Sequence, residues 1–121
     1  MKLTENQERV LDALRDVSRT NVLRYRQNTP YLYEQDCKKL VRGDEACAFG
    51  LGGLSYQVGA RLDLSAAAVL NTFKALERKG LVLRESSYPE YQRPRYWWPV
   101  GFAAEMAAQL LPVEAEASCP T

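Results

Sequence analysis

Hydrophobic side chains near the start of the chain recur at the spacing of an α-helix. They lie four and then three positions apart, with charged residues between them: Val10, Leu14 and Val17. Thr4 and Gln7 have the three-residue separation of a capping box, which satisfies the first backbone amides of a helix. The pattern predicts an amphipathic helix over residues 4–18, with one face in the protein core.

Two further helices are predicted in the middle of the chain, each directly after a serine. Ser55 is expected to cap a short helix over residues 56–62. Ser65 is expected to cap a longer helix over residues 66–79, and Gly80 marks its C-terminal end. The hydrophobic positions of these two helices are Val58, Leu62, Val69, Phe73 and Leu76. Both helices are therefore amphipathic and need a common core.

A β-hairpin is predicted after the longer helix. Residues 81–86 have the composition of a strand, residues 87–94 contain two prolines and favour a loop, and residues 95–98 favour a returning strand. Adjacent strand residues point to opposite sides, so Trp97 and Trp98 must separate. We expect one of them in the core and the other against a final helix or a dimer partner.

The final helix is predicted over residues 102–111, where hydrophobic side chains recur every four positions: Phe102, Met106 and Leu110. Pro112 ends this helix, and residues 112–121 are expected to be disordered. We interpret residues 1–111 as a single domain that is mainly α-helical with a small β-hairpin.

Residues 19–54 have the weakest periodicity, and we interpret them as an insertion of unassigned role. A helix is predicted over residues 31–42, and the glycines of residues 49–53 favour a connecting segment. Three tyrosines lie in the insertion: Tyr25, Tyr31 and Tyr33. We expect them to pack this segment against the domain; an effector pocket is the less favoured alternative.

Composition argues against catalysis and metal binding. The 121 residues are 46% hydrophobic and 26% charged, as in a folded soluble protein, and include no histidine. The usual general base at neutral pH and the commonest metal ligand are therefore missing. The three cysteines have no CxxC spacing: Cys37, Cys47 and Cys119. We expect no enzyme activity, no metal and no cofactor.

No hydrophobic stretch approaches the roughly 20 residues that span a bilayer, and the N-terminus does not resemble a signal peptide. We therefore expect a cytoplasmic protein without a membrane partner. Its formal charge of +1 comes from 16 basic and 15 acidic residues. All 16 basic residues and 12 of the acidic residues lie in residues 1–100, so the body is mildly basic and the last 21 residues are acidic.

Residues 55–96 combine several sequence features, each of which is common on its own. Gly59 is a small residue midway along the first of two helices, where a second helix has to cross closely. Asp63 stands in the turn between them, and tolerates left-handed backbone. Hydrophobic residues flank this turn: Val58, Leu62, Leu64 and Val69. A Leu-Glu-Arg-Lys-Gly-Leu-Val junction follows at residues 76–82, and a Gln-Arg-Pro-Arg-Tyr segment at residues 92–96.

With these motifs in this order, residues 55–101 resemble the winged helix-turn-helix of bacterial transcriptional regulators of the MarR and PadR type. Residues 55–79 would be the helix-turn-helix and residues 81–98 the wing. Residues 4–18 resemble the first helix of the family more loosely. The segment between these two regions is longer than the usual link.

The resemblance implies sequence-specific binding of double-stranded DNA, with the second helix of the motif in the major groove and the wing on the flanking backbone or minor groove. Its outward face would comprise Ala66, Ala67, Leu70, Asn71, Lys74 and Arg78. Asn71 is the side chain there that can form a bidentate contact with adenine. Further contacts, mainly to phosphates, would come from Ser55, Tyr56, Gln57, Ser65, Lys79, Arg93 and Arg95.

The resemblance also implies a small prokaryotic regulator, more often a repressor than an activator, that forms a homodimer through Phe102, Met106 and Leu110. Two alternatives remain. The hydrophobic face of Ala66, Ala67 and Leu70 also suits a protein partner, as in a winged-helix interaction module or a phage- or plasmid-encoded inhibitor. A plasmid replication or partition protein would share the DNA chemistry and differ in its binding site.

Overall fold

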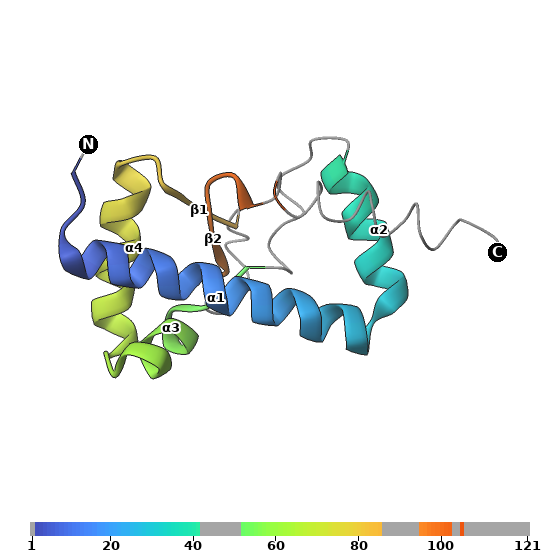
Figure 1. The fold of residues 1–121 in the computed structure, drawn as a ribbon, viewed down its shortest axis with the longest axis horizontal. Coiled ribbons are helices and arrows are strands. Elements are labelled where there is room, and N and C mark those ends of the chain that lie inside the picture. The colour runs from blue at the N-terminus through green and yellow to red at the C-terminus, as the bar shows by residue number, and fades with distance from the viewer. Residues whose placement is uncertain (1, 42–51, 86–94, 103–104, 106–121) are drawn as a thin grey trace, which may run out of the picture.

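The computed structural model describes residues 2–41, 52–85, 95–102 and 105. Within these residues it contains four helices and one two-stranded antiparallel sheet, in the order α1, α2, α3, α4, β1, β2. The predicted class, mainly α-helical with a small antiparallel strand pair, is confirmed. Helix α1 runs along the molecule, with α4 against its N-terminal half, α3 against its middle and α2 at its C-terminal end (Figure 1).

Helix α1 spans Glu5–Asn28 and begins with the predicted capping box. The Gln7 backbone N–H donates to the Thr4 hydroxyl and the Thr4 N–H donates to the Gln7 side chain, both at 3.1 Å. The predicted end at residue 18 is wrong, because the helix continues for ten more residues. Val22 is buried and Asn21 is hydrogen-bonded to other segments, so tertiary contacts stabilise a stretch without a regular hydrophobic stripe.

Helix α2 spans Pro30–Val41, close to the predicted range. It begins with a proline, whose fixed φ suits the first helical position. The helix packs against the end of α1: the Tyr25 hydroxyl donates to the Asp36 carboxylate, and the rings of Tyr25 and Tyr33 meet edge to face with centroids 6.1 Å apart. Cys37 is buried beside them. The first part of the insertion is thus a helical hairpin.

Helices α3 and α4 span Ser55–Leu62 and Ala66–Arg78. Ser55 was predicted as the cap of α3, but it is the first helical residue, and Leu54 is the N-cap. The Gln57 side chain does the capping, because its Oε1 accepts the Leu54 N–H at 3.0 Å. Ser65 caps α4 as predicted: its hydroxyl accepts the Ala68 N–H at 3.1 Å.

The turn between α3 and α4 has the left-handed residue that the sequence indicated. Asp63 has φ 56° and ψ 46°, and the N–H of the next residue, Leu64, donates to the Gly59 carbonyl at 2.9 Å. A Cβ on Gly59 would lie 2.5 Å from the Leu64 carbonyl oxygen. The close neighbour that requires glycine is therefore this turn, and not the body of α4 as predicted.

Strands β1 and β2 span Val82–Arg84 and Trp97–Pro99, and they pair antiparallel with Leu83 opposite Trp98. Both strands are shorter than predicted. Gly53 adds an isolated bridge on the other edge of β2: it donates to the Trp97 carbonyl at 2.7 Å and accepts the Trp97 N–H at 2.8 Å. The segment before α3 is thereby fixed to β2.

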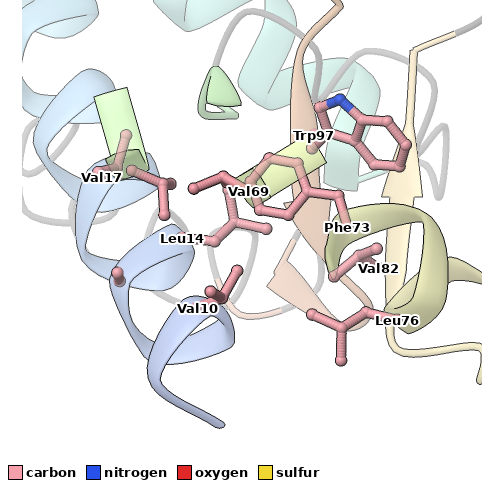
Figure 2. Close-up of a cluster of buried hydrophobic side chains, with 10 residues drawn as sticks. Val10, Leu14, Val17, Val69, Phe73, Leu76, Val82 and Trp97 are labelled. Atoms are coloured by element: carbon pink, nitrogen blue, oxygen red, sulfur yellow. The ribbon is translucent and has the colours of Figure 1, made fainter. Parts of the chain in front are cut away.

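The core lies where α1, α3, α4 and the strands meet (Figure 2). It contains the predicted hydrophobic positions of α1, α3 and α4 except Leu62, which is half-buried against it, and two strand residues. These core residues are Val10, Leu14, Val17, Val58, Val69, Phe73, Leu76, Val82 and Trp97. The rings of Phe73 and Trp97 have centroids 5.2 Å apart. Trp98 is as fully buried as Trp97, although it lies outside this cluster.

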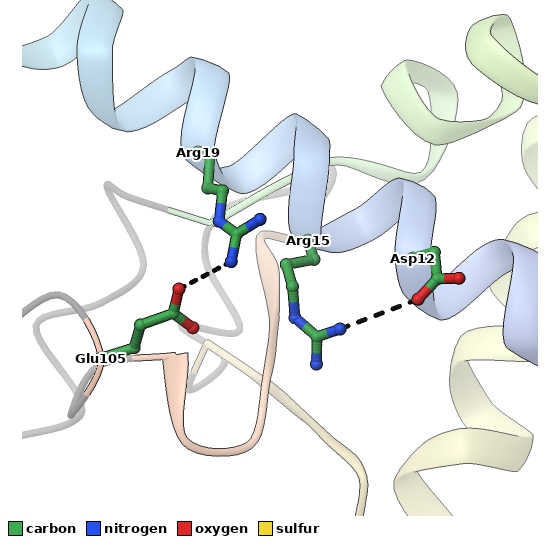
Figure 3. Close-up of polar contacts among 4 residues, drawn as sticks. All are labelled: Asp12, Arg15, Arg19 and Glu105. Atoms are coloured by element: carbon green, nitrogen blue, oxygen red, sulfur yellow. Dashed lines mark hydrogen bonds and ion pairs between the residues drawn. The ribbon is translucent and has the colours of Figure 1, made fainter.

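The segment after β2 is fixed to α1 by an ion pair. Arg19 of α1 lies 2.7 Å from the Glu105 carboxylate, whereas Arg15 pairs within the same helix with Asp12 at 3.7 Å (Figure 3). Phe102 is buried within the chain itself. Much of the predicted final helix, the tail 112–121 and Cys47 and Cys119 lie outside the described residues.

Candidate nucleic-acid interface

The outer face of α4 contains most of the residues that were predicted on the DNA-facing side of this helix. Its exposed members are Ala66, Ala67, Ala68, Asn71, Lys74 and Arg78. Leu70 was predicted on this face, but it is half-buried against the core cluster, so only part of its side chain is accessible. The accessible polar groups of this face are therefore the Asn71 amide and the cations of Lys74 and Arg78, which lie among small side chains.

The two cations of this face have no acidic partner among the residues that the structure describes. Among the ion pairs of the described residues, none includes Lys74 or Arg78. The acidic residue of α4, Glu77, is half-buried and binds the Nε of Arg84 at 3.0 Å. In the described part of the chain, the outer face of α4 therefore has two cations and no ion pair that includes them.

Lys79 was predicted as a phosphate ligand, but its ammonium group already has a protein partner. It donates to Gln7 Oε1 at 2.8 Å, and the same oxygen accepts the Thr4 N–H of the capping box. Nearby, the Asn6 amide donates to the Thr72 hydroxyl at 3.3 Å. These contacts hold the first turn of α1 against α4, so Lys79 contributes to the position of α4.

The start of α3 contains three of the predicted contact residues in different surroundings. Tyr56 is 55% exposed, and Ser55 is half-buried. Gln57 is fixed from two sides, because its Oε1 accepts the Leu54 N–H and the Asn21 amide, each at 3.0 Å. Tyr56 is thus the accessible member of this group, whereas Gln57 joins α3 to α1.

The structure describes one of the two arginines that were predicted for the wing. Arg95 is half-buried just before β2, and Arg93 lies outside the described residues. Arg84, at the end of the paired strand β1, was not among the predicted contact residues. Its guanidinium carbon lies 5.7 Å from the centre of the Trp97 ring, and Glu77 binds its Nε. Arg84 therefore connects the sheet to α4 through its charge and its stacking.

An open cleft of about 280 Å³ lies between the C-terminal half of α1, the start of α3 and Tyr96. Its described lining residues are all polar: Asn21, Arg24, Tyr25, Asn28, Thr29, Gln57 and Tyr96. The less favoured prediction of a pocket lined by Tyr25, Tyr31 and Tyr33 fits only its first member, because Tyr31 is 70% exposed and Tyr33 packs against Tyr25. The cleft could not be predicted from local sequence patterns, because its residues come from three separate segments.

The hydroxyl of Tyr33, in the neighbouring α1–α2 hairpin, has a shifted pKa. Burial, together with its hydrogen bond to Cys37, raises the pKa of Tyr33 to about 12. The guanidinium of Arg26, 5.9 Å from the centre of its ring, opposes this shift. The neutral phenol is therefore the form that the α1–α2 hairpin stabilises.

Within the described residues, no group of three His, Cys, Asp or Glu side chains could hold a metal ion. In that same part of the chain, every helix is too short or too polar to cross a membrane. Comparison of the chain with protein-family models, with curated proteins and with solved structures finds no match in any of the three.

Proposed function

We propose that the chain is a winged helix-turn-helix protein that binds double-stranded DNA in a sequence-specific manner. The observation that carries the proposal is the outer face of α4, which combines an exposed Asn71 amide with two cations outside the described ion pairs, Lys74 and Arg78. This face follows a tight α3–α4 turn with Asp63 in the left-handed conformation. An antiparallel strand pair, the base of a wing, packs beside the same helix.

In the proposed complex, α4 enters the major groove with its N-terminal half toward the bases. The small side chains of Ala66 and Ala67 allow its backbone to approach closely, and Asn71 forms a bidentate contact with adenine. Lys74 and Arg78 bind backbone phosphates, and so does the exposed Tyr56 at the start of α3. The wing arginines, Arg93 and Arg95, bind the flanking DNA.

We further propose that the protein acts as a homodimeric transcriptional regulator in a prokaryotic cytoplasm. Two copies would read half-sites about 34 Å apart, which is one turn of B-form DNA. Occupation of such an operator would exclude polymerase and repress transcription. The dimer would form through the C-terminal segment that contains Met106 and Leu110.

Selection of bound fragments from a random DNA library, followed by affinity measurements at several salt concentrations, tests the proposal. Asn71→Ala should relax the preference at one base pair, a loss of about 1–3 kcal/mol of discrimination. The double variant Lys74→Gln, Arg78→Gln should weaken binding to all sequences and flatten the salt dependence by about 0.9 per lost phosphate contact.

Lys39→Gln provides the matched control, because Lys39 is an exposed cation on α2, away from α4. It should leave both preference and salt dependence unchanged. Recovery of no enriched motif, or an equal effect of all the charge-removing variants, would contradict the proposal.

The exposed alanines of α4 favour a second candidate function. Three consecutive exposed residues at its start, Ala66, Ala67 and Ala68, offer few hydrogen-bond donors for reading bases. A protein partner could instead pack on this face. Ala67→Arg separates the two functions, because added positive charge should preserve or strengthen retention on bulk DNA at low salt but should block a close protein contact.

A further inference from the structure

The polar cleft at the end of α1 has the charge and hydrogen-bonding groups of an anion site. Arg24 is the cation among its described lining residues, and no carboxylate occurs among them. The ion pairs of the described residues leave Arg24 without an acidic partner. Two carboxylates are bonded to lining residues from outside the cleft: Asp36 accepts the hydroxyl of Tyr25, and Glu85 Oε1 accepts the Tyr96 backbone N–H at 3.0 Å. Within the described residues, the guanidinium of Arg24 is therefore not paired with a carboxylate.

Hydrogen bonds already present determine which lining groups remain as donors. The Asn21 amide donates to the Gly52 carbonyl at 2.7 Å and to Gln57 Oε1 at 3.0 Å, so both of its hydrogens are used. The Thr29 hydroxyl donates to the Tyr25 carbonyl at 3.0 Å. These residues build the wall of the cleft and do not supply donors to a ligand.

Gln57 contributes a donor because its oxygen is doubly occupied. Its Oε1 accepts from Leu54 and from Asn21, and these two bonds orient the amide and leave its NH₂ group available. The Asn28 amide and the Tyr96 hydroxyl line the same cleft, and no described hydrogen bond uses either side chain. Three residues with neutral donor groups, from three segments, thus line the same cleft as Arg24.

We propose that this cleft binds a phosphate group. The planar guanidinium of Arg24 pairs with two phosphate oxygens, and the neutral donors take the others. The cleft is open to solvent, so the remainder of a phosphate ester can extend out of it. The phosphate belongs either to the backbone of bound DNA or to a free phosphate ester. The first of these two alternatives rests on the proposed function.

Titration of the intact chain with inorganic phosphate tests the site without DNA. The readout is the NMR shift of the side-chain amide signals of Gln57 and Asn28. We expect a saturable shift in the wild type, and at least a tenfold weaker phosphate affinity in Arg24→Gln. Arg24→Lys keeps the charge but loses the paired geometry, so it should retain only part of the affinity.

Arg26→Gln is the matched control, because Arg26 lies on the same helix but over the Tyr33 ring. It should bind phosphate as the wild type does. Absence of a saturable shift in the wild type, or an equal loss in the Arg24 and Arg26 variants, would overturn the proposal.

A second arm identifies the source of the phosphate by measuring duplex DNA affinity against salt concentration. If Arg24→Gln flattens the salt dependence by about 0.9, the cleft holds a DNA phosphate. If the salt dependence is unchanged while inorganic phosphate binding is lost, the site serves a free phosphate ester. Should the wild type bind no DNA, the proposed function fails and the phosphate titration alone still decides the site.

Discussion

The carbonyl oxygen of Leu64 occupies the space that a side chain on Gly59 would need. The Cβ of an alanine at position 59 would lie 2.5 Å from this oxygen, well inside van der Waals contact. The oxygen belongs to the turn that sets the angle between α3 and α4. Glycine at position 59 thus allows the α3–α4 turn to pack closely against α3.

Gly59→Ala should therefore destabilise the protein, although alanine is the better helix former by about 1 kcal/mol. The steric conflict involves backbone, which cannot rotate away, so we expect a net loss of about 1–3 kcal/mol in the free energy of unfolding. Urea denaturation measures it. Ala60→Ser, an exposed neighbour in α3, should change stability by less than about 0.5 kcal/mol. Stabilisation by Gly59→Ala would show that the turn can move.

Phe73→Ala should cost about 3–5 kcal/mol, because Phe73 is fully buried and packs on Trp97 with ring centroids 5.2 Å apart. Its removal leaves a cavity between α4 and β2. Denaturant unfolding gives the loss, and tryptophan fluorescence reports the changed surroundings of Trp97. Phe73→Leu, which fills more of the space, should cost clearly less. Equal losses for the two variants would argue against a cavity as the cause.

The Ser65 hydroxyl caps α4 at the end that the proposed function turns toward DNA. Ser65→Ala should lose about 1 kcal/mol of stability, because the Ala68 N–H loses its partner. Ser65→Asp keeps a capping oxygen and adds a favourable charge at the helix N-terminus, so stability should be retained. DNA affinity should nevertheless fall in Ser65→Asp, because its carboxylate faces phosphates. Unimpaired DNA binding by this variant would place the N-terminus of α4 away from the duplex.

Tyr33 should make stability decrease at alkaline pH. Its pKa is about 12 in the folded chain, raised by burial and by Cys37, against an ordinary value of 10. The folded state therefore retains a proton that the unfolded state releases, so stability is full below pH 10 and decreases as pH rises toward 12. Urea denaturation at pH 9 and pH 11 should show a larger decrease for the wild type than for Tyr33→Phe. In an ultraviolet titration, this variant should lack one tyrosine that ionises near pH 12. Loss of a tyrosine that ionises near the ordinary value of 10 would contradict the assignment.

Much of the α3–α4 region could be predicted from interactions between residues that lie close together in the sequence. The Ser65 cap, the left-handed Asp63 and the Gly80 stop each depend on the backbone of their immediate neighbours, and Gly80 has φ 76°. Hydrophobic spacing likewise identified the core positions of three helices. Such signals are readable because the interacting residues lie within a few positions of one another.

The contacts that position the candidate sites lie far apart in the sequence. Lys79 reaches Gln7 across 72 positions, and Asn21 reaches Gln57 across 36. The residues of α1 beyond position 18 have no regular hydrophobic stripe, so their helix depends on partners that no local pattern reveals. Lys79 was consequently predicted as a phosphate ligand, and its hydrogen bond to Gln7 was not foreseen.

Asn21→Ala tests whether such a distant contact organises the cleft. The variant removes the donor that serves the Gly52 carbonyl and Gln57 Oε1, in part-buried surroundings, so we expect a loss of about 1–2 kcal/mol in unfolding free energy. Asn28→Ala is the matched control, because Asn28 lines the same cleft but is exposed and has no described hydrogen bond. It should change stability by less than about 0.5 kcal/mol. Since Gln57 loses one of its two anchors only in Asn21→Ala, hydrogen exchange at the first turn of α3 should accelerate in that variant alone. Equal exchange rates in both variants would show that Leu54 by itself holds Gln57 in place.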